Sequence, residues 1–239
     1  MAFACGVAAI GLATSGIQAA RAQDSGKRAK VGEPTAERTL GIVIFPGFQF
    51  LDAAGPLEIW GNLRGQVKVV TVASRAGEVA SAQGPRLVAD HGYADCPKLD
   101  LLLVPGGFGV LPLLKDGATL DWLRERSATA EITMSVCNGA SLLAAAGLLD
   151  DRPATTNKAY WKMATTPGPK VDWVKQARWV DDGDVVTSSG VSAGMDMSLH
   201  VIERLFGEKK AAAVANQIEY DWHRDPAWDP FAKLHGLAD

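Results

Sequence analysis

The sequence predicts an α/β fold in which helices cover both faces of an open, mostly parallel sheet. Short, nearly continuous apolar runs, such as 39–45 and 99–104, are typical of strands that are buried on both faces of a parallel sheet. Segments of helical composition alternate with these runs, and this alternation indicates parallel strands joined by crossover helices. In such sheets the functional site lies beyond the carboxyl ends of the strands.

The other elements follow in chain order. The first helix is expected at 56–62, because a proline in the first helical turn loses little through its missing N–H. Alternating residues around glycine-containing turns predict hairpins at 78–89 and 178–187. Further strands are expected at 67–72 and 131–136, and further helices at 116–127, 138–146, 192–205 and 208–220. A mixed aromatic and charged tail at 219–231 is expected to fold back on the domain or to meet a partner subunit.

The N-terminal part differs from the rest and divides the chain into three regions. Residues 2–20 carry no charge, and Ala20-Arg21-Ala22 has the A-x-A form of a signal-peptidase site. We therefore expect a signal peptide at 1–22, a polar linker at 23–38, and a single domain at 39–239. The location would be periplasmic or secreted. A stable membrane span is not expected, because glycine and alanine dilute the apolar run.

Composition narrows the classes of partner and cofactor. The 239 residues are 47% hydrophobic and 21% charged with a net charge of -3, which gives no electrostatic basis for binding nucleic acid or an anionic membrane. Three cysteines, Cys5, Cys96 and Cys137, do not make a disulfide framework. The histidines lack ligand spacing, and no glycine-rich phosphate motif is present, so neither a metal nor a nucleotide cofactor is expected.

Three glycine-bearing turns follow three of the predicted buried strands, at 46–47, 105–107 and 136–139. Neighbouring parallel strands would bring these turns to one edge of the sheet. The third turn resembles a nucleophile elbow that presents Cys137, and a helix starting near Asn138 would direct its free N–H groups at the sulfur. This arrangement predicts a thiol pKa well below the unperturbed value of about 8.5. A buried cysteine with a purely structural role is the alternative.

Six ordered segments resemble proteins of the ThiJ/PfpI superfamily. The resemblance implies a flavodoxin-like fold with a nucleophile elbow. Leu51-Asp52-x-x-Gly55-Pro56 and Gly190-Val-Ser-Ala-Gly194 are most similar to the isocyanide hydratase branch, and they also resemble sensor domains of AraC-type regulators. The six segments are 41–60, 100–107, 135–139, 146–149, 153–156 and 189–196.

The resemblance implies roles for particular residues. The family's nucleophile matches Cys137 and its acidic partner matches Asp52. Its anion-stabilising backbone N–H groups match Gly107 and Asn138. The leading hypothesis is a cysteine-dependent hydratase or hydrolase of a small electrophilic molecule, in which Asp52 relays a proton. Residues expected to border the substrate are Gly106, Thr156 and Trp161.

Two departures from the family pattern bear on the choice of function. Asn138 follows the cysteine where protease-like members carry histidine, and Asn157 stands where many members have another histidine. Peptidase activity is therefore not expected, because it needs a base paired with the thiol. A glyoxalase or deglycase function and a non-catalytic periplasmic sensor domain remain open alternatives. The resemblance also implies a homodimer.

Overall fold

The computed structural model describes Met1 and residues 37–238 of the chain. The expected signal peptide at 1–22, and all of the expected linker except its last two residues, lie outside the described residues. Contacts group Thr35–Asp239 into one compact unit. Its first strand begins at Arg38, one residue before the predicted boundary.

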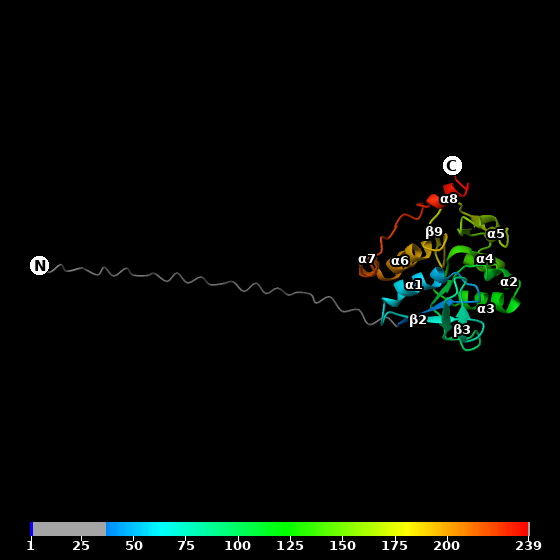
Figure 1. The fold of residues 1–239 in the computed structure, drawn as a ribbon, viewed down its shortest axis with the longest axis horizontal. Coiled ribbons are helices and arrows are strands. Elements are labelled where there is room, and N and C mark those ends of the chain that lie inside the picture. Colours follow the sequence, from blue (N-terminus) through cyan, green and yellow to red (C-terminus); the bar gives the residue numbers. More distant parts are fainter. Residues whose placement is uncertain (2–36, 239) are drawn as a thin grey trace. The chain divides into compact units, whose positions relative to one another are not determined.

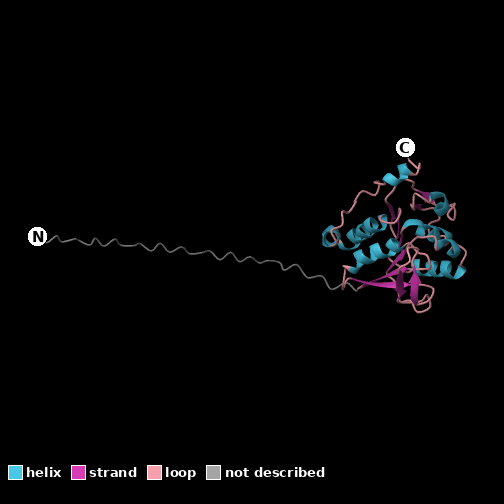
Figure 2. Ribbon diagram, in the orientation of Figure 1, coloured by secondary structure: helices cyan, strands magenta, loops and turns pink. Residues whose placement is uncertain are grey.

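A six-stranded sheet forms the centre of this unit, in the order β2-β1-β5-β6-β10-β9 (Figure 2). The first five strands in this order pair in parallel, and β9 pairs antiparallel with β10 at the edge. The predicted open and mostly parallel sheet is confirmed. Two hairpins appear where they were predicted, as β3 with β4 and as β9 with β10. The strands are β1 Arg38–Val43, β2 Val67–Val72, β3 Gly77–Ala80, β4 Arg86–Ala89, β5 Leu101–Val104, β6 Ile132–Ser135, β7 Pro153–Ala154, β8 Asp172–Trp173, β9 Trp179–Asp182 and β10 Val185–Ser188.

Helices cover the sheet in two groups (Figure 1). One group contains α1, α6 and α7, and the other contains α2, α3 and α4. No helix among residues 37–238 is both long enough and apolar enough to cross a membrane. The helices are α1 Phe50–Gly61, α2 Val110–Leu113, α3 Gly117–Ser127, α4 Ala140–Ala145, α5 Trp161–Thr165, α6 Ala193–Phe206, α7 Glu208–Gln217 and α8 Pro230–Leu234, with a 3-10 turn at Cys137–Gly139.

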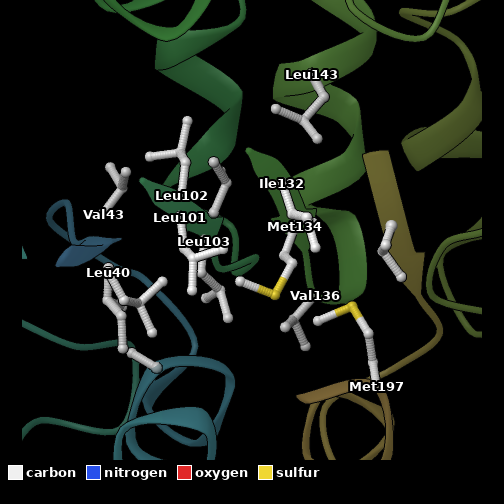
Figure 3. Packing of buried hydrophobic residues seen from close by; sticks show 14 of the residues in the cluster. Leu40, Val43, Leu101, Leu102, Leu103, Ile132, Met134, Val136, Leu143 and Met197 are labelled. Carbon is white, nitrogen blue, oxygen red and sulfur yellow. The ribbon is translucent and has the colours of Figure 1, made fainter. Parts of the chain in front are cut away.

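Both faces of the central strands are buried, as their apolar sequences predict. All four residues of β5 and all four of β6 are buried. Figure 3 shows Leu143 of α4 and Met197 of α6 on opposite sides of the strand side chains, which include Met134 of β6. Burial of this kind stabilises a fold by about 25 cal/mol per Å² of apolar surface. The core therefore fixes the carboxyl ends of β1, β5 and β6, where the turns begin.

The first helix differs from the prediction. It begins at Phe50 rather than at Pro56, so that the proline lies inside the helix. A proline there removes one helical hydrogen bond, to the carbonyl of Asp52. Contacts from outside hold the preceding turn instead, because Phe50 N–H donates to Gln83 Oε1 (2.8 Å) and the carboxylate of Asp52 accepts from Gly106 (2.8 Å).

The C-terminal segment folds back on the domain, which was one of the two expected outcomes. Arg178 N–H donates to the carbonyl of Pro226 (2.6 Å), and the Arg178 guanidinium pairs with buried Asp196 (2.7 Å). Asp196 also accepts from the Tyr220 hydroxyl (3.0 Å) and the His223 N–H (3.1 Å). Asp196, in the first turn of α6, therefore has a structural role in fixing the tail.

Candidate active site

The three glycine turns meet at one edge of the sheet. Gly109 N–H donates to the carbonyl of Gly47 (3.2 Å), and Gln49 N–H donates to that of Gly106 (2.8 Å). Gly107 N–H donates to Asn138 Oδ1 (2.7 Å), and Asn138 Nδ2 donates back to the Gly107 carbonyl (3.2 Å). These bonds connect the ends of β1, β5 and β6 into one rigid cluster around Cys137.

Cys137 has the backbone geometry of a nucleophile elbow. Its φ is +57°, in the left-handed region that residues other than glycine rarely adopt. Two hydrogen bonds hold this conformation: Cys137 N–H donates to the carbonyl of Ser189 (3.0 Å), and the Thr156 hydroxyl donates to the carbonyl of Cys137 (2.9 Å). The cysteine is 5% exposed. Strain that the surroundings enforce in this way is typical of functional sites.

Asp52 lies in the first turn of α1 and is fully buried. Its Oδ2 accepts the Gly106 N–H (2.8 Å), whereas Oδ1 is buried without a hydrogen-bond partner of ordinary geometry. Burial raises the pKa of Asp52 to about 7, although the Gly106 N–H and the Cys137 thiol act in the opposite direction. A carboxyl group with this pKa can both accept and donate a proton near neutral pH.

The thiol pKa moves in the direction opposite to the one that the sequence predicts. Burial and the charge of Asp52 raise the pKa of Cys137 to about 12. Three donors oppose this rise: the backbone N–H groups of Asn138 and Val191 and the side chain of Asn157. The N–H donors at the elbow do favour the thiolate, but the loss of solvent and the charge of the neighbouring acid outweigh them. The elbow also begins with a 3-10 turn and continues into only six residues of α4.

A cavity of about 70 Å³ opens onto the sulfur. Phe108 and Tyr160 stand at its rim, half-exposed, with their rings in edge contact at 5.0 Å between centroids. A separate hollow of about 570 Å³ beside α1 and α7 has mainly polar lining residues, including the exposed Glu58, and shares none with this cavity. The residues that line the smaller cavity are Gln49, Gly107, Phe108, Cys137, Asn138, Asn157, Tyr160 and Val191.

The structure places the remaining sequence-predicted residues in different positions. Gly107 and Asn138 line the cavity, but the Gly107 N–H is occupied by Asn138 Oδ1 and does not point freely at a ligand. Gly106 lies behind the cavity, where a Cβ would overlap Asn138. Thr156 supports the elbow through its hydroxyl. Trp161 is not among the lining residues and packs on Trp173 at 6.2 Å between ring centroids.

Sequence reasoning missed several lining residues. Gln49 is positioned by Gln83 of the β3–β4 turn, whose Nε2 donates to Gln49 Oε1 (2.8 Å). No local sequence motif predicts that contact. Val191 has a φ of +36°, which is unusual for a β-branched residue, and this conformation aims its N–H at the sulfur. Asn157 could have been predicted to line the cavity, because it follows Thr156 at a position where many family members have histidine.

The lining of the cavity limits the chemistry available. Within the described part of the chain, no histidine lines the cavity around Cys137, and no group of three His, Cys, Asp or Glu side chains is arranged to hold a metal ion. Asp52 is thus the acid-base group beside the thiol. The arrangement combines a buried thiol, one buried carboxyl group and three N–H donors around the sulfur.

Comparison with known proteins identifies the family. The model of the DJ-1/PfpI family matches residues 38–204. The chain belongs to the DJ-1/PfpI family. This match spans the whole six-stranded sheet, both turns that flank Cys137, and Asp52, and it ends before the C-terminal segment that contains α8.

Relatives within the DJ-1/PfpI family include an enzyme and regulators. The isonitrile hydratase of Pseudomonas putida is 39% identical over 183 residues, which are 76% of this chain and 78% of the hydratase. The HTH-type transcriptional regulator CdhR of Pseudomonas aeruginosa is 28% identical over 180 residues, which are 74% of this chain but only 53% of the regulator.

Solved structures of DJ-1/PfpI proteins share the fold. A ThiJ/PfpI family protein from Pseudomonas syringae superposes with a TM-score of 0.73 at 29% identity, covering 89% of this chain and 86% of that protein. DJ-1beta of Drosophila melanogaster superposes with a TM-score of 0.67 at 20% identity, covering 78% of this chain and 100% of that protein. Because DJ-1beta is only 20% identical to this chain, its likeness concerns the fold alone.

Proposed function

We propose that this protein is a cysteine-dependent hydratase that adds water to a small isocyanide. The observation that carries the proposal is the buried pair of Cys137 and Asp52, in a cavity without histidine among the described residues. A 39% identical relative named isonitrile hydratase supports the same chemistry, since an isonitrile is an isocyanide.

The proposed reaction conserves atoms and protons. As the Cys137 sulfur bonds to the terminal carbon of R–NC, Asp52 takes the thiol proton and delivers it to that carbon, giving the thioimidate R–N=CH–S–Cys137. Water then adds to the same carbon, the C–S bond breaks, and the products are R–NH–CHO and the free thiol. Asp52 suits both transfers because its pKa of about 7 lies near neutral pH.

The donors around the sulfur have a defined part in this scheme. The N–H groups of Asn138 and Val191 and the Asn157 amide stabilise negative charge on the sulfur as the proton leaves. The cavity of about 70 Å³ has the volume of about two water molecules, which suits a terminal N≡C group.

Kinetics of three proteins test the proposal. Asp52→Asn keeps an acceptor for the Gly106 N–H but cannot relay a proton, so turnover of methyl isocyanide should fall by about 10²–10⁴-fold. Cys137→Ser should abolish turnover, because a serine hydroxyl is a much weaker nucleophile than a thiol and loses its proton less readily. Lys170→Ala, an exposed change, is the control and should match wild type. Equal rates in wild type and both site variants would exclude this mechanism.

A sensor function is the second candidate, because HTH-type regulators are among the relatives of this chain. A sensor would bind a ligand in the Cys137 cavity and would turn over no isocyanide, methylglyoxal or related electrophile. Calorimetry on wild type and Cys137→Ser separates the candidates, since unchanged ligand binding without any turnover favours the sensor. Turnover of methylglyoxal alone would instead favour a glyoxalase or deglycase.

We also propose that the chain is exported. The support lies in the uncharged residues 2–20 and the A-x-A site that ends at Ala22. N-terminal sequencing of protein from the periplasmic fraction should then find Gln23 as the first residue. An intact Met1 terminus on protein from the cytosol would contradict export.

A further inference from the structure

The cavity at Cys137 is too small for a whole substituted isocyanide. Its volume of about 70 Å³ accommodates the N≡C group and little else. The substituent on nitrogen must therefore lie in a neighbouring space. A second cavity, of about 220 Å³, shares Asn157 and Val191 with the first. Both shared residues also direct donors at the sulfur, so the second cavity adjoins the Cys137 cavity at Asn157 and Val191.

The second cavity has the character of a binding pocket for an apolar group. Its exposed lining is more apolar than polar, and its volume equals about seven water molecules. Gly190 packs closely against Asn157, because a Cβ there would come within 2.7 Å of Asn157 Nδ2. The lining includes Asn157, Gly190, Val191, Ser192, Phe231 and His235. By contrast, a hollow of about 430 Å³ on the far side of Lys158 shares only Tyr160 with the Cys137 cavity.

One wall of the second cavity comes from the C-terminal segment, which lies beyond the matched family region. Phe231 is on α8, whose first turn is capped by Asp229 Oδ1 accepting from the Phe231 N–H (3.0 Å). The other carboxylate oxygen of Asp229 lies 3.4 Å from Lys158 Nζ, and both side chains are almost fully buried. Lys158 directly follows Asn157, so this ion pair fixes Phe231 relative to the active-site loop.

We propose that the second cavity binds the nitrogen substituent of the isocyanide and that Phe231 sets the preference for an apolar group of about six to eight non-hydrogen atoms. This inference rests on the proposed function. The wall that α8 provides lies in the C-terminal segment, outside the matched family region. Phe231 is a specificity-determining residue, and the Lys158–Asp229 pair positions it.

Paired substrates test the role of Phe231. Phe231→Ala should raise the KM for benzyl isocyanide about ten-fold, in the range expected for apolar contacts in a pocket, with kcat nearly unchanged. Methyl isocyanide should be unaffected, because its substituent does not reach the cavity. Leu234→Ala is the matched control, since Leu234 lies on the same helix, is 71% exposed and does not line the cavity.

A second variant fills the cavity instead of opening it. Ala159 lines the cavity with an exposed side chain, so Ala159→Phe should block benzyl isocyanide and leave methyl isocyanide as a substrate. Thermal unfolding and light scattering of each variant verify that fold and assembly are unchanged. If Phe231→Ala and Ala159→Phe affect the two substrates equally while wild type is active, the cavity proposal is wrong and the hydratase proposal stands.

Binding of the hydration product separates this inference from the catalytic proposal. Calorimetry should show N-benzylformamide binding at least about ten-fold more tightly than N-methylformamide, with the difference lost in Phe231→Ala. If wild type turns over neither isocyanide but keeps this binding pattern, the hydratase proposal fails and the cavity assignment holds. If the two formamides bind equally to wild type, the cavity assignment fails whatever the turnover.

Discussion

The Asp52 carboxyl and the Cys137 thiol are two acids that lose their solvent together. Burial raises both pKa values, and a charge on either group opposes a charge on the other. The pair therefore carries a single negative charge over a broad range of pH above about 7. The N–H donors at the sulfur and the Gly106 N–H at the carboxylate stabilise that charge at the two ends of the pair.

The raised pKa of Asp52 makes folding stability depend on pH. Between its ordinary value of 3.8 and its folded value of about 7, the native state binds more protons at this site than the unfolded chain does. The Asp52 contribution to stability therefore falls as pH rises through that window. Asp52→Asn should remove this dependence, so that its stability relative to wild type increases from pH 4 to pH 7 in urea unfolding.

A control of opposite sign is available at Asp184. Its hydrogen bond with Arg152 lowers the pKa of this carboxyl, so its contribution is present above the unfolded pKa and is lost as pH falls. Asp184→Asn should therefore lose stability relative to wild type as pH rises through the acid range. If Asp52→Asn behaved in the same way, Asp52 would not be the buried, proton-retaining acid described above.

At the scale of single residues, some site residues could be predicted from the sequence and others could not. Cys137 and Asn138 could be located because a strand end, a glycine turn and a family motif coincide there, whereas Asp52 could be located from the family motif alone. Trp161 was a poor choice for a lining residue, because the turn before α5 brings its neighbour Tyr160 to the cavity instead. Side-chain direction at such a turn depends on backbone angles that the sequence pattern does not specify.

Among the elements, the strands of the central sheet were predictable and the first helix was not. Strands buried on both faces need long apolar runs, so β1, β5 and β6 were predicted to within a few residues. The edge strand β2 was predicted with its observed bounds. The start of α1 depends on Gln83 and Gly106, which are distant in sequence, so local propensity placed it six residues too late. The short helix α8 likewise depends on a long-range ion pair.

That ion pair makes the attachment of α8 testable. Lys158→Met would leave Asp229 buried without its cation, which should destabilise the fold by about 3–5 kcal/mol. The double variant with Asp229→Asn should recover part of that loss, because the amide keeps a cap for α8 without a buried charge. Chemical denaturation measures all three proteins.

Lys170 provides the matched control for that experiment. It pairs with Asp150 at 2.9 Å on the surface, where solvent screens the charges, so Lys170→Met should leave stability nearly unchanged. A loss for Lys158→Met as small as that for Lys170→Met would mean that the buried pair does not anchor the tail.

At the scale of the whole molecule, the alternation of strands and helices was enough to predict the architecture. The position of the site follows from the common carboxyl edge of the parallel strands. The second cavity could not be predicted, because it joins the loop after β7 to a C-terminal segment some seventy residues later. Only the folded tail shows that the two regions meet.

At the scale of the whole molecule, the protein is also expected to form a homodimer. The resemblance implies a homodimer, and the tail offers apolar surface for a self-complementary contact, since Trp228 remains 40% exposed while stacked on His223. Light scattering at micromolar concentration should give twice the mass of one chain, which is 25.2 kDa before the expected signal peptide is removed. Trp228→Glu should weaken the dimer, because a charge would enter an apolar contact. A wild-type mass of one chain would refute the dimer. A dimer that Trp228→Glu leaves intact would place its interface away from the tail.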